Sequence, residues 1–162
     1  MRRNGINTGP FEQNGWAGYQ RGFGSAANKG NFWWGLENLH KITSIGKWNV
    51  LFMLRNVEGN FALIQFNGFS VGSSSDNYRL SIERKNYQYL GSSDVRLQTY
   101  ARLVGVLNNE MFTTNDADND RHSTGNMAKL HGGGFWFGTD TLFLYPPTGK
   151  HFHYSLMAIS RA

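Results

Sequence analysis

Three aspartates at every second position form the part of the sequence best suited to chemistry. They are Asp116, Asp118 and Asp120, in the stretch NDADNDRHSTGNMAKLHGGGFWF of residues 115–137. Alternate carboxylates can converge on one hard cation where the backbone curls, and calcium takes about 6–8 oxygen ligands in proteins. The same residues also suit a solvated turn, in which aspartate side chains bond to their own backbone. The residues alone leave both interpretations open.

The aspartate run does not fit the EF-hand calcium loop. With Asp116 as the first position, the sixth position is Arg121, where that loop needs glycine. The twelfth position is Met127, where it needs a glutamate. A calcium site in this run must therefore be built in another way.

Other candidate chemistry is weaker. The sequence has no cysteine, which excludes disulfides, thiolate metal ligands and thiol nucleophiles. His151 and His153 could bind a metal on one strand face, but packing or surface roles are commoner for such residues. The HGGGFWF stretch lacks the lysine of a phosphate-binding loop, and its glycines suit a sharp turn. No Ser-His-Asp order or carboxylate pair stands out, so a hydrolase or any other enzyme is the least favoured class.

Composition indicates one domain with an aromatic core. The 162 residues include 20 glycines, 5 tryptophans, 7 tyrosines and 12 phenylalanines. This mixture favours short strands, tight turns and an interior packed with rings. Trp33, Trp34, Trp48 and Trp136 could stack on sugars, but their apolar neighbours predict that most of them lie in the core.

Charge and hydropathy argue against a nucleic-acid-binding protein and against a membrane-spanning helix. The net charge is +5, but basic residues are adjacent only at Arg2-Arg3 and Arg84-Lys85, which disfavours a nucleic-acid surface. No apolar run reaches the roughly 18 residues of a membrane helix. The N-terminal stretch MRRNGINTGPFEQ also lacks the apolar core of a signal peptide.

Hydrophobic periodicity predicts the elements that must position the aspartates. Trp16, Tyr19 and Phe23 share helical spacing between glycines, and a second helix in FWWGLENLHKIT places Leu36, Leu39 and Thr43 on one face. Residues 47–56 are predicted to form a buried strand, 60–72 a second strand bulged at Gly68, 77–91 one or two short strands, and 153–162 an alternating last strand. Residues 103–149 show no clean periodicity and are predicted to be rich in loops, which are usually functional at such length.

Several motifs together resemble the fibrinogen-like (fibrinogen C-terminal) domain. MFTTNDADND, GNMA and GGGFWF are similar to its F-S/T-T-x-D-x-D-N-D, N-C-A and G-G-W-W-Y signatures. Upstream, the sequences WAGYQRGFG, GNFWWGLENLHKIT and NYRLSIERKNYQYLG resemble further family segments in the same order, as HYSLMAISRA does at the end. The resemblance therefore covers most of the chain.

The resemblance implies that the aspartate run is a Ca²⁺ site. The family's two side-chain ligands fall on Asp118 and Asp120, whereas Asp116 matches a position that is usually not a ligand. Two backbone carbonyls of the following turn complete the protein ligands, from His122 and from Thr124 or Ser123.

The ligand pocket that the family carries is altered here. A family cysteine pair falls on Met127 and approximately on Asp140, so we expect this edge to be wetter or rearranged. A cysteine-histidine dipeptide falls on Asp140-Thr141, and the third aromatic of the triplet, often tyrosine, is Phe137. We therefore expect a pocket at Phe137, Asp140 and Thr141 with weakened recognition of acetyl groups.

The sequence thus predicts an α+β domain over residues 1–162: a twisted, mainly antiparallel sheet with two short helices, and a loop-rich calcium region. Residues 1–102 would form the sheet and helices, 103–149 the calcium and pocket loops, and 150–162 the closing strand. By resemblance the function is non-enzymatic recognition outside the cell, of a glycan, an acetylated ligand or an extracellular protein, with oligomers formed through upstream regions. The alternative is a structural remnant of the fold without calcium or ligand.

Overall fold

The structure is a computed structural model that describes residues 2–4, 9–27, 30–56, 58–83, 87–93, 105–138 and 154–162. An antiparallel sheet of seven strands dominates these residues. The strand order is β2-β3-β1-β11-β4-β5-β8, and β10-β9 and β6-β7 form two separate pairs. The strands are β1 (Arg2–Asn4), β2 (Phe23–Gly24), β3 (Phe32–Trp33), β4 (Trp48–Arg55), β5 (Phe61–Phe66), β6 (Ser70–Val71), β7 (Leu80–Ser81), β8 (Tyr87–Gly91), β9 (Phe112–Thr113), β10 (Phe135–Trp136) and β11 (Tyr154–Arg161). The helices are α1 (Gly9–Gln13), α2 (Trp16–Arg21), α3 (Leu36–Thr43) and α5 (Met127–His131), with 3₁₀ turns at Ser74–Asp76 and Gly105–Leu107. The predicted α+β class is confirmed.

The middle of the sheet buries one face of each strand. The side chains that point to the core alternate along β4 and β5, and they are Val50, Phe52, Leu54, Ala62, Ile64 and Phe66. The strand register places Val50 opposite Phe66 and Leu54 opposite Ala62, which makes these side chains one continuous apolar face. The strand predicted over residues 47–56 is confirmed as β4, and it buries alternate residues because the sheet packs only one face on the core.

The chain leaves the main sheet after β5. Gly68 has a φ of 63°, in the left-handed region that favours glycine. The next strand, β6, pairs with β7 instead, and the N–H of Val71 donates to the hydroxyl of Thr43 on α3 over 3.1 Å. The prediction of one bulged strand over 60–72 was therefore wrong, because Gly68 turns the chain from one sheet to another.

Both predicted helices are present but shorter than predicted. α2 ends at Arg21, so Phe23 lies in β2, and α3 begins at Leu36, so Phe32–Trp33 forms β3. Two short N-terminal elements, β1 and α1, were not predicted because their few residues are too short to show a period.

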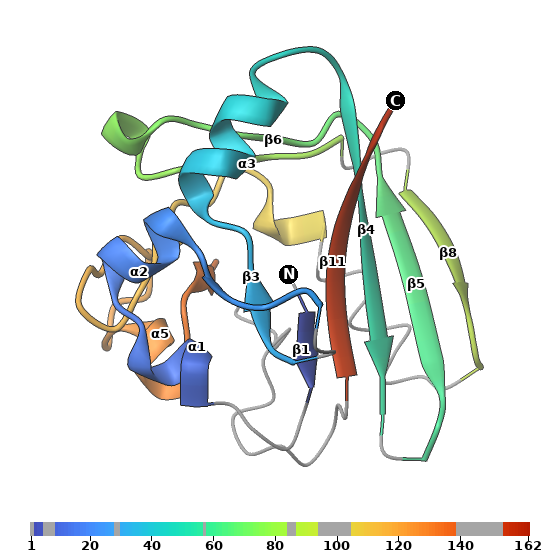
Figure 1. The fold of residues 1–162 in the computed structure, drawn as a ribbon, viewed down its shortest axis with the longest axis horizontal. Coiled ribbons are helices and arrows are strands. Elements are labelled where there is room, and N and C mark those ends of the chain that lie inside the picture. Colours follow the sequence, from blue (N-terminus) through green and yellow to red (C-terminus); the bar gives the residue numbers. More distant parts are fainter. Residues whose placement is uncertain are drawn as a thin grey trace.

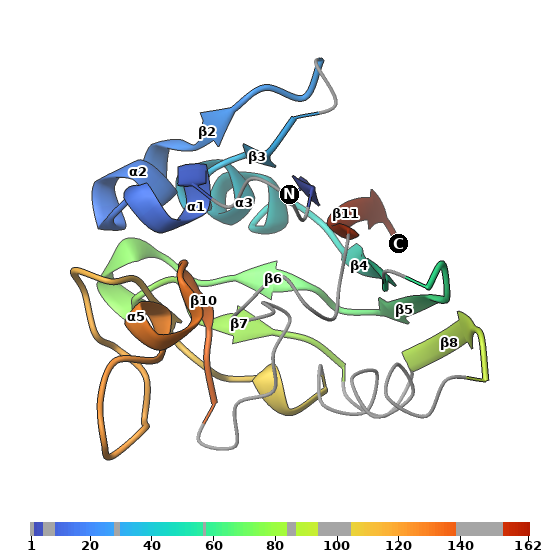
Figure 2. The same cartoon turned by 90° about the horizontal axis from the view of Figure 1, so that it is seen from below.

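The two ends of the described chain meet in the middle of the sheet. β11 confirms the predicted last strand and lies between β1 and β4, as Figure 1 shows. In the same view α1, α2 and α5 gather beyond the β3 side of the sheet, far from β8. The loop between β9 and α5, coloured light orange, projects from this helical end in Figure 2.

A cluster of rings fills the space between this helical end and the sheet. Its four central members are almost fully buried, with neighbouring ring centroids 5.0–6.3 Å apart: Tyr19, Trp33, Phe112 and Trp136. Their polar atoms are satisfied inside the protein, since the indole N–H of Trp33 donates to the Tyr19 carbonyl and that of Trp136 to the Tyr78 carbonyl. The aspartate run thus begins directly beside a closely packed aromatic cluster.

The region predicted as loops contains more structure than expected. β9, α5 and β10 all lie between residues 103 and 149, and residues 105–138 of it are described. Each element is only two to five residues long, which explains why hydrophobic periodicity did not reveal them.

Candidate functional site

The aspartate loop, defined here as residues 114–126, curls back on itself directly after β9. A backbone bridge joins Thr114 and Ala117, with N–H to carbonyl distances of 2.9 and 3.3 Å. Asn119 then ties the loop to β9: its N–H donates to the Thr113 hydroxyl over 3.0 Å, and its side-chain amide donates to the Phe112 carbonyl over 2.9 Å. The loop is therefore held by its own polar side chains against a buried strand.

Asp116 has a structural task. Its Oδ1 accepts hydrogen bonds from the Trp16 N–H over 2.8 Å and from the Thr114 hydroxyl over 2.6 Å. Gly15 permits this approach, because a Cβ at that position would lie 2.3 Å from the Asp116 Oδ2. Burial by itself raises the pKa of Asp116, but the bonds from Thr114, Trp16 and its own backbone outweigh it and leave the pKa below its ordinary value. This carboxylate fastens the loop to α2.

Asp120 holds the far end of the loop. Its Oδ1 accepts from the His122 N–H over 2.9 Å, and its Oδ2 accepts from the Met127 N–H, at the start of α5, over 3.0 Å. A carboxylate oxygen has more than one acceptor site, so both atoms can still bind a cation. The two bonds fix the direction in which the carboxylate points.

Asp118 differs from both neighbours. It is exposed, and within the described residues no hydrogen bond or ion pair engages its carboxylate. The loop fixes the backbone on either side of it through Asn119 and the Thr114–Ala117 bridge. Asp118 is thus a carboxylate on a fixed backbone with no internal structural task.

The predicted carbonyl ligands lie in the turn that follows. The His122 ring Nδ1 is 3.0 Å from the Thr124 hydroxyl, which draws the two residues together. Within the described residues neither the His122 nor the Thr124 carbonyl accepts a hydrogen bond. An open hollow of about 500 Å³ borders this turn, lined by His122, Thr124, Gly125, Asn126, Met127, Lys129 and Leu130.

These donors fit Ca²⁺ rather than a softer metal. The available atoms are carboxylate and carbonyl oxygens, which calcium prefers. No three histidine, aspartate or glutamate side chains come together as a metal-binding group in the described part of the chain. A cation here would therefore depend on Asp118, Asp120, main-chain carbonyls and water.

An ion pair between the buried Glu110 and the exposed Arg121 braces the middle of the loop, and no sequence pattern indicates it. Glu110 is 3% exposed, and its two carboxylate oxygens accept from the guanidinium of Arg121. The bond to Glu110, followed by its charge, raises the pKa of Arg121 further. Because Arg121 follows Asp120 directly, the pair also constrains the predicted ligand.

The predicted ligand pocket is only partly described. Phe137 is 3% exposed and lies among other rings, 5.6 Å from the ring of His131. Asp140 and Thr141 lie outside the described residues, as do His151 and His153. Met127, at the position of a family cysteine, is buried, so this side of the expected wetter edge is apolar.

Two residues of this region carry a local helix-boundary signal that hydrophobic periodicity does not detect. Asn126 caps α5: its Oδ1 accepts from the Lys129 N–H, and its side-chain amide donates to the Thr114 carbonyl. Gly132 ends the helix with a φ of 66°. An asparagine and a glycine that flank MAKLH are typical helix boundaries, so α5 could have been predicted from its caps.

The fold and the loop together define a fibrinogen-like globular domain. The family described as the C-terminal globular domain of fibrinogen beta and gamma chains matches residues 1–156, so the chain belongs to this family. Human angiopoietin-4 is 34% identical over 152 residues, which cover 94% of this chain and 27% of that protein. Mouse angiopoietin-related protein 6 is 35% identical over 122 residues, 75% of this chain and 24% of the relative.

A solved structure supports the same assignment. The fibrinogen-like globe domain of human ANGPTL6 superimposes with a TM-score of 0.76 at 26% identity, and the match covers 100% of this chain and 76% of that domain. The chain spans about a quarter of the length of both curated relatives. None of the helices in the described residues is long and apolar enough to cross a membrane.

Proposed function

We propose that the domain is a non-enzymatic recognition module whose aspartate loop binds one structural Ca²⁺. The observation that carries the calcium proposal is that the polar side chains of the aspartate loop differ in their bonding to the protein. Asp116, Asn119 and Asn126 fasten the backbone, whereas Asp118 has no bond to the described protein. Asp118 and Asp120, with the carbonyls of His122 and Thr124, then supply the protein ligands.

The charge of this set indicates a modest affinity. Two carboxylates supply fewer charges than an EF-hand loop, and Asp118 is open to solvent. Calcium affinity depends on ligand charge and site rigidity, and extracellular modules bind calcium with a Kd of about 10⁻⁴–10⁻³ M. We propose an extracellular location on the basis of the domain's place in the fibrinogen-like family, and a calcium affinity in this range would suit it.

For the ligand, an extracellular protein is favoured over an acetylated glycan. Phe137 has no hydroxyl group and is buried, so it offers no polar contact to an acetyl group. A polar ligand group left without its partner loses about 1–3 kcal/mol. The relatives named angiopoietin contain the domain as a minor part of a longer chain, which suits a module that binds other proteins.

Calorimetric titration with calcium tests the metal proposal. The wild type should bind one Ca²⁺ with a Kd of about 10⁻⁴–10⁻³ M. Asp118→Ala should abolish binding without unfolding the domain, because this side chain makes no bond to the described protein. Glu58→Ala removes the same charge from a distant exposed turn and should bind like the wild type. Equal binding by Asp118→Ala would refute this ligand set.

Retention on N-acetylglucosamine resin separates the two ligand classes. We expect no calcium-dependent retention, because Phe137 and the altered Asp140-Thr141 segment lack the family's polar contacts. Retention in calcium and release by free acetate or chelator would establish the lectin function instead. Failure to bind calcium or any extracellular partner would favour the structural remnant.

A further inference from the structure

A polar hollow lies at the β6–β7 pair, outside the aspartate loop. Its volume of about 540 Å³ falls within the roughly 300–1,000 Å³ of ligand sites. In Figure 2 β6 and β7 run side by side, and the yellow 3₁₀ turn Gly105–Leu107 lies next to β7. The polar side chains of the lining come from these strands and from the segments that follow β6 and the 3₁₀ turn: Ser70, Asp76, Arg79, Ser81, Asn108 and Asn109.

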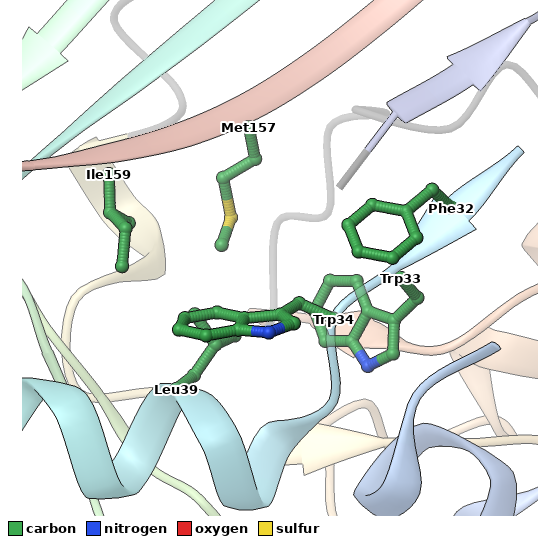
Figure 3. A pocket seen from close by; sticks show the side chains of 6 residues that line it. All are labelled: Phe32, Trp33, Trp34, Leu39, Met157 and Ile159. Atoms are coloured by element: carbon green, nitrogen blue, oxygen red, sulfur yellow. The ribbon is translucent and has the colours of Figure 1, made fainter. Parts of the chain in front are cut away.

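An apolar hollow elsewhere in the domain shows the contrast. It measures about 170 Å³ and is lined by apolar and aromatic side chains alone, as Figure 3 shows: Phe32, Trp33, Trp34, Leu39, Met157 and Ile159. A hydroxyl or amide group of a ligand would lose its hydrogen bonds to water there with little replacement. The polar hollow can replace those bonds, so it is the better place for a polar ligand.

An ion pair with a fixed geometry forms part of the polar hollow. The Nε of Arg79 donates to both carboxylate oxygens of Asp76, over 3.0 and 3.2 Å. The Nη1 of Arg79 also donates to the Asn109 carbonyl over 2.8 Å, which ties the guanidinium to the second segment. Because the two charges neutralise each other inside the hollow, the site suits an uncharged ligand.

Four further side chains offer polar atoms that the protein itself does not use. Within the described residues no hydrogen bond engages the hydroxyls of Ser70 and Ser81 or the side-chain amide of Asn109. The Oδ1 of Asn108 accepts from the Ile82 N–H over 2.8 Å, which leaves the Nδ2 of Asn108 as a free donor. The hollow therefore presents several hydrogen-bonding groups at once.

The backbone beneath these groups is fixed. Ser70 lies opposite Ser81 in the β6–β7 pair, so the two side chains share a face of it. Asn109 has a φ of 72°, in the left-handed region that asparagine tolerates, and its N–H donates to the Leu80 carbonyl over 2.8 Å. Groups that are already held in place lose less entropy when a ligand binds.

We propose that the polar hollow binds a neutral saccharide through the hydroxyl groups of the sugar. A sugar hydroxyl both donates and accepts hydrogen bonds, which matches serine hydroxyls and asparagine amides. A protein partner would need apolar or aromatic anchors, and the one apolar residue of the lining, Leu80, is 1% exposed. An anionic sugar would bring its carboxylate close to Asp76. This site is separate from the calcium site and from the Phe137 pocket.

Nuclear magnetic resonance titration of the whole chain with single sugars tests the proposal. The probes are glucose, galactose and mannose, each compared with its uronate, which is the same ring with a carboxylate. At least one hexose should shift the side-chain amide signals of Asn108 and Asn109 in a saturable way, with a Kd in the millimolar range because the ligand is small. Its uronate should bind about tenfold more weakly, because of the like charge of Asp76.

Three variants check that the binding occurs in the hollow. Asn109→Gly suits the left-handed backbone and removes only the amide, and Asn108→Asp keeps the acceptor for Ile82 but loses the free donor. Each of these, and Ser81→Ala, should weaken the sugar about tenfold. Ser160→Ala removes a hydroxyl from an exposed position on β11 and is the matched control, which should bind like the wild type.

The possible outcomes are distinct. No saturable shift with any of the three hexoses, equal or tighter binding of the uronate, or wild-type binding by the three hollow variants would each overturn the proposal. Addition of chelator and the replacement Asp118→Ala should leave sugar binding unchanged. A failure of the calcium site and a failure of the polar hollow can therefore be told apart.

Discussion

At the scale of single residues, Trp136 shows how the aromatic cluster supports the aspartate loop. Its side chain is fully buried, its ring centroid is 5.0 Å from that of Phe112, and its N–H donates to the Tyr78 carbonyl over 2.7 Å. Trp136→Ala should lower the free energy of unfolding by about 3–5 kcal/mol, as expected for a large buried aromatic. Urea denaturation measures this, and a loss below about 1 kcal/mol would mean that the ring does not support the core.

The replacement Trp136→Phe separates bulk from hydrogen bonding. It keeps most of the ring volume but leaves the Tyr78 carbonyl without its donor. The loss in the free energy of unfolding should be clearly smaller than for alanine, because the cavity is smaller. Equal losses for the two variants would assign the effect to the hydrogen bond alone.

His131 should make the stability of the domain depend on pH. Burial lowers the pKa of His131, more than the nearby charge of Asp120 raises it, while His122 lowers it further. The unfolded chain takes up this proton near the ordinary value of about 6.5, and the folded chain only at lower pH. The stabilising contribution is therefore complete above about pH 6.5 and is lost as the pH falls toward the folded pKa.

Melting curves at about pH 7.5 and about pH 5.5 test this dependence. On acidification the melting temperature of His131→Leu should fall less than that of the wild type, because no buried imidazole remains to be protonated. His122→Asn, at a half-buried position in the same region, is the control and should retain most of the dependence. An unchanged acid sensitivity in His131→Leu would assign the effect to other groups.

At the scale of elements, the Glu110–Arg121 pair should join the aspartate loop to the core. Arg121→Ala leaves a buried carboxylate without its partner, whereas Glu110→Gln with Arg121→Ala removes the charge as well. The double variant should therefore be more stable than Arg121→Ala alone. Urea denaturation of the full double-mutant cycle measures the coupling free energy between the two residues. Additive changes in the free energy of unfolding would show that the pair contributes nothing to stability.

The predictability of these elements followed their length. α3 and β4 were visible in the sequence because eight residues of each show a clear period. β9, β10 and α5 are too short for periodicity, and only the caps of α5 carried a local signal. The Glu110–Arg121 pair joins residues that no sequence pattern links, so only the folded chain reveals it. The separation of β6 from β5 likewise depends on one glycine in a left-handed conformation.

At the scale of the whole molecule, the family assignment rests on motifs spread along the chain, and those were readable from the sequence. The predicted calcium ligands stay a prediction, but the structure adds a distinction that spacing could not give. Asp116 fastens the loop to α2, Asp120 fastens it to α5, and Asp118 makes no bond to the described residues. Asp116→Ala should therefore lower the melting temperature yet keep its rise in calcium. Asp120→Ala should lower the melting temperature and also abolish that rise.

The melting temperature in calcium and in chelator tests the central claim most directly. Calcium that binds only the folded state stabilises it by RT ln(1 + [Ca]/Kd), about 1.4 kcal/mol at ten times Kd. For a chain of this size we expect a rise of about 3–6 °C in roughly 10 mM calcium, which Asp118→Ala should abolish and Glu58→Ala should retain. Identical melting of the wild type in calcium and in chelator would contradict the calcium site and leave the structural remnant as the better account.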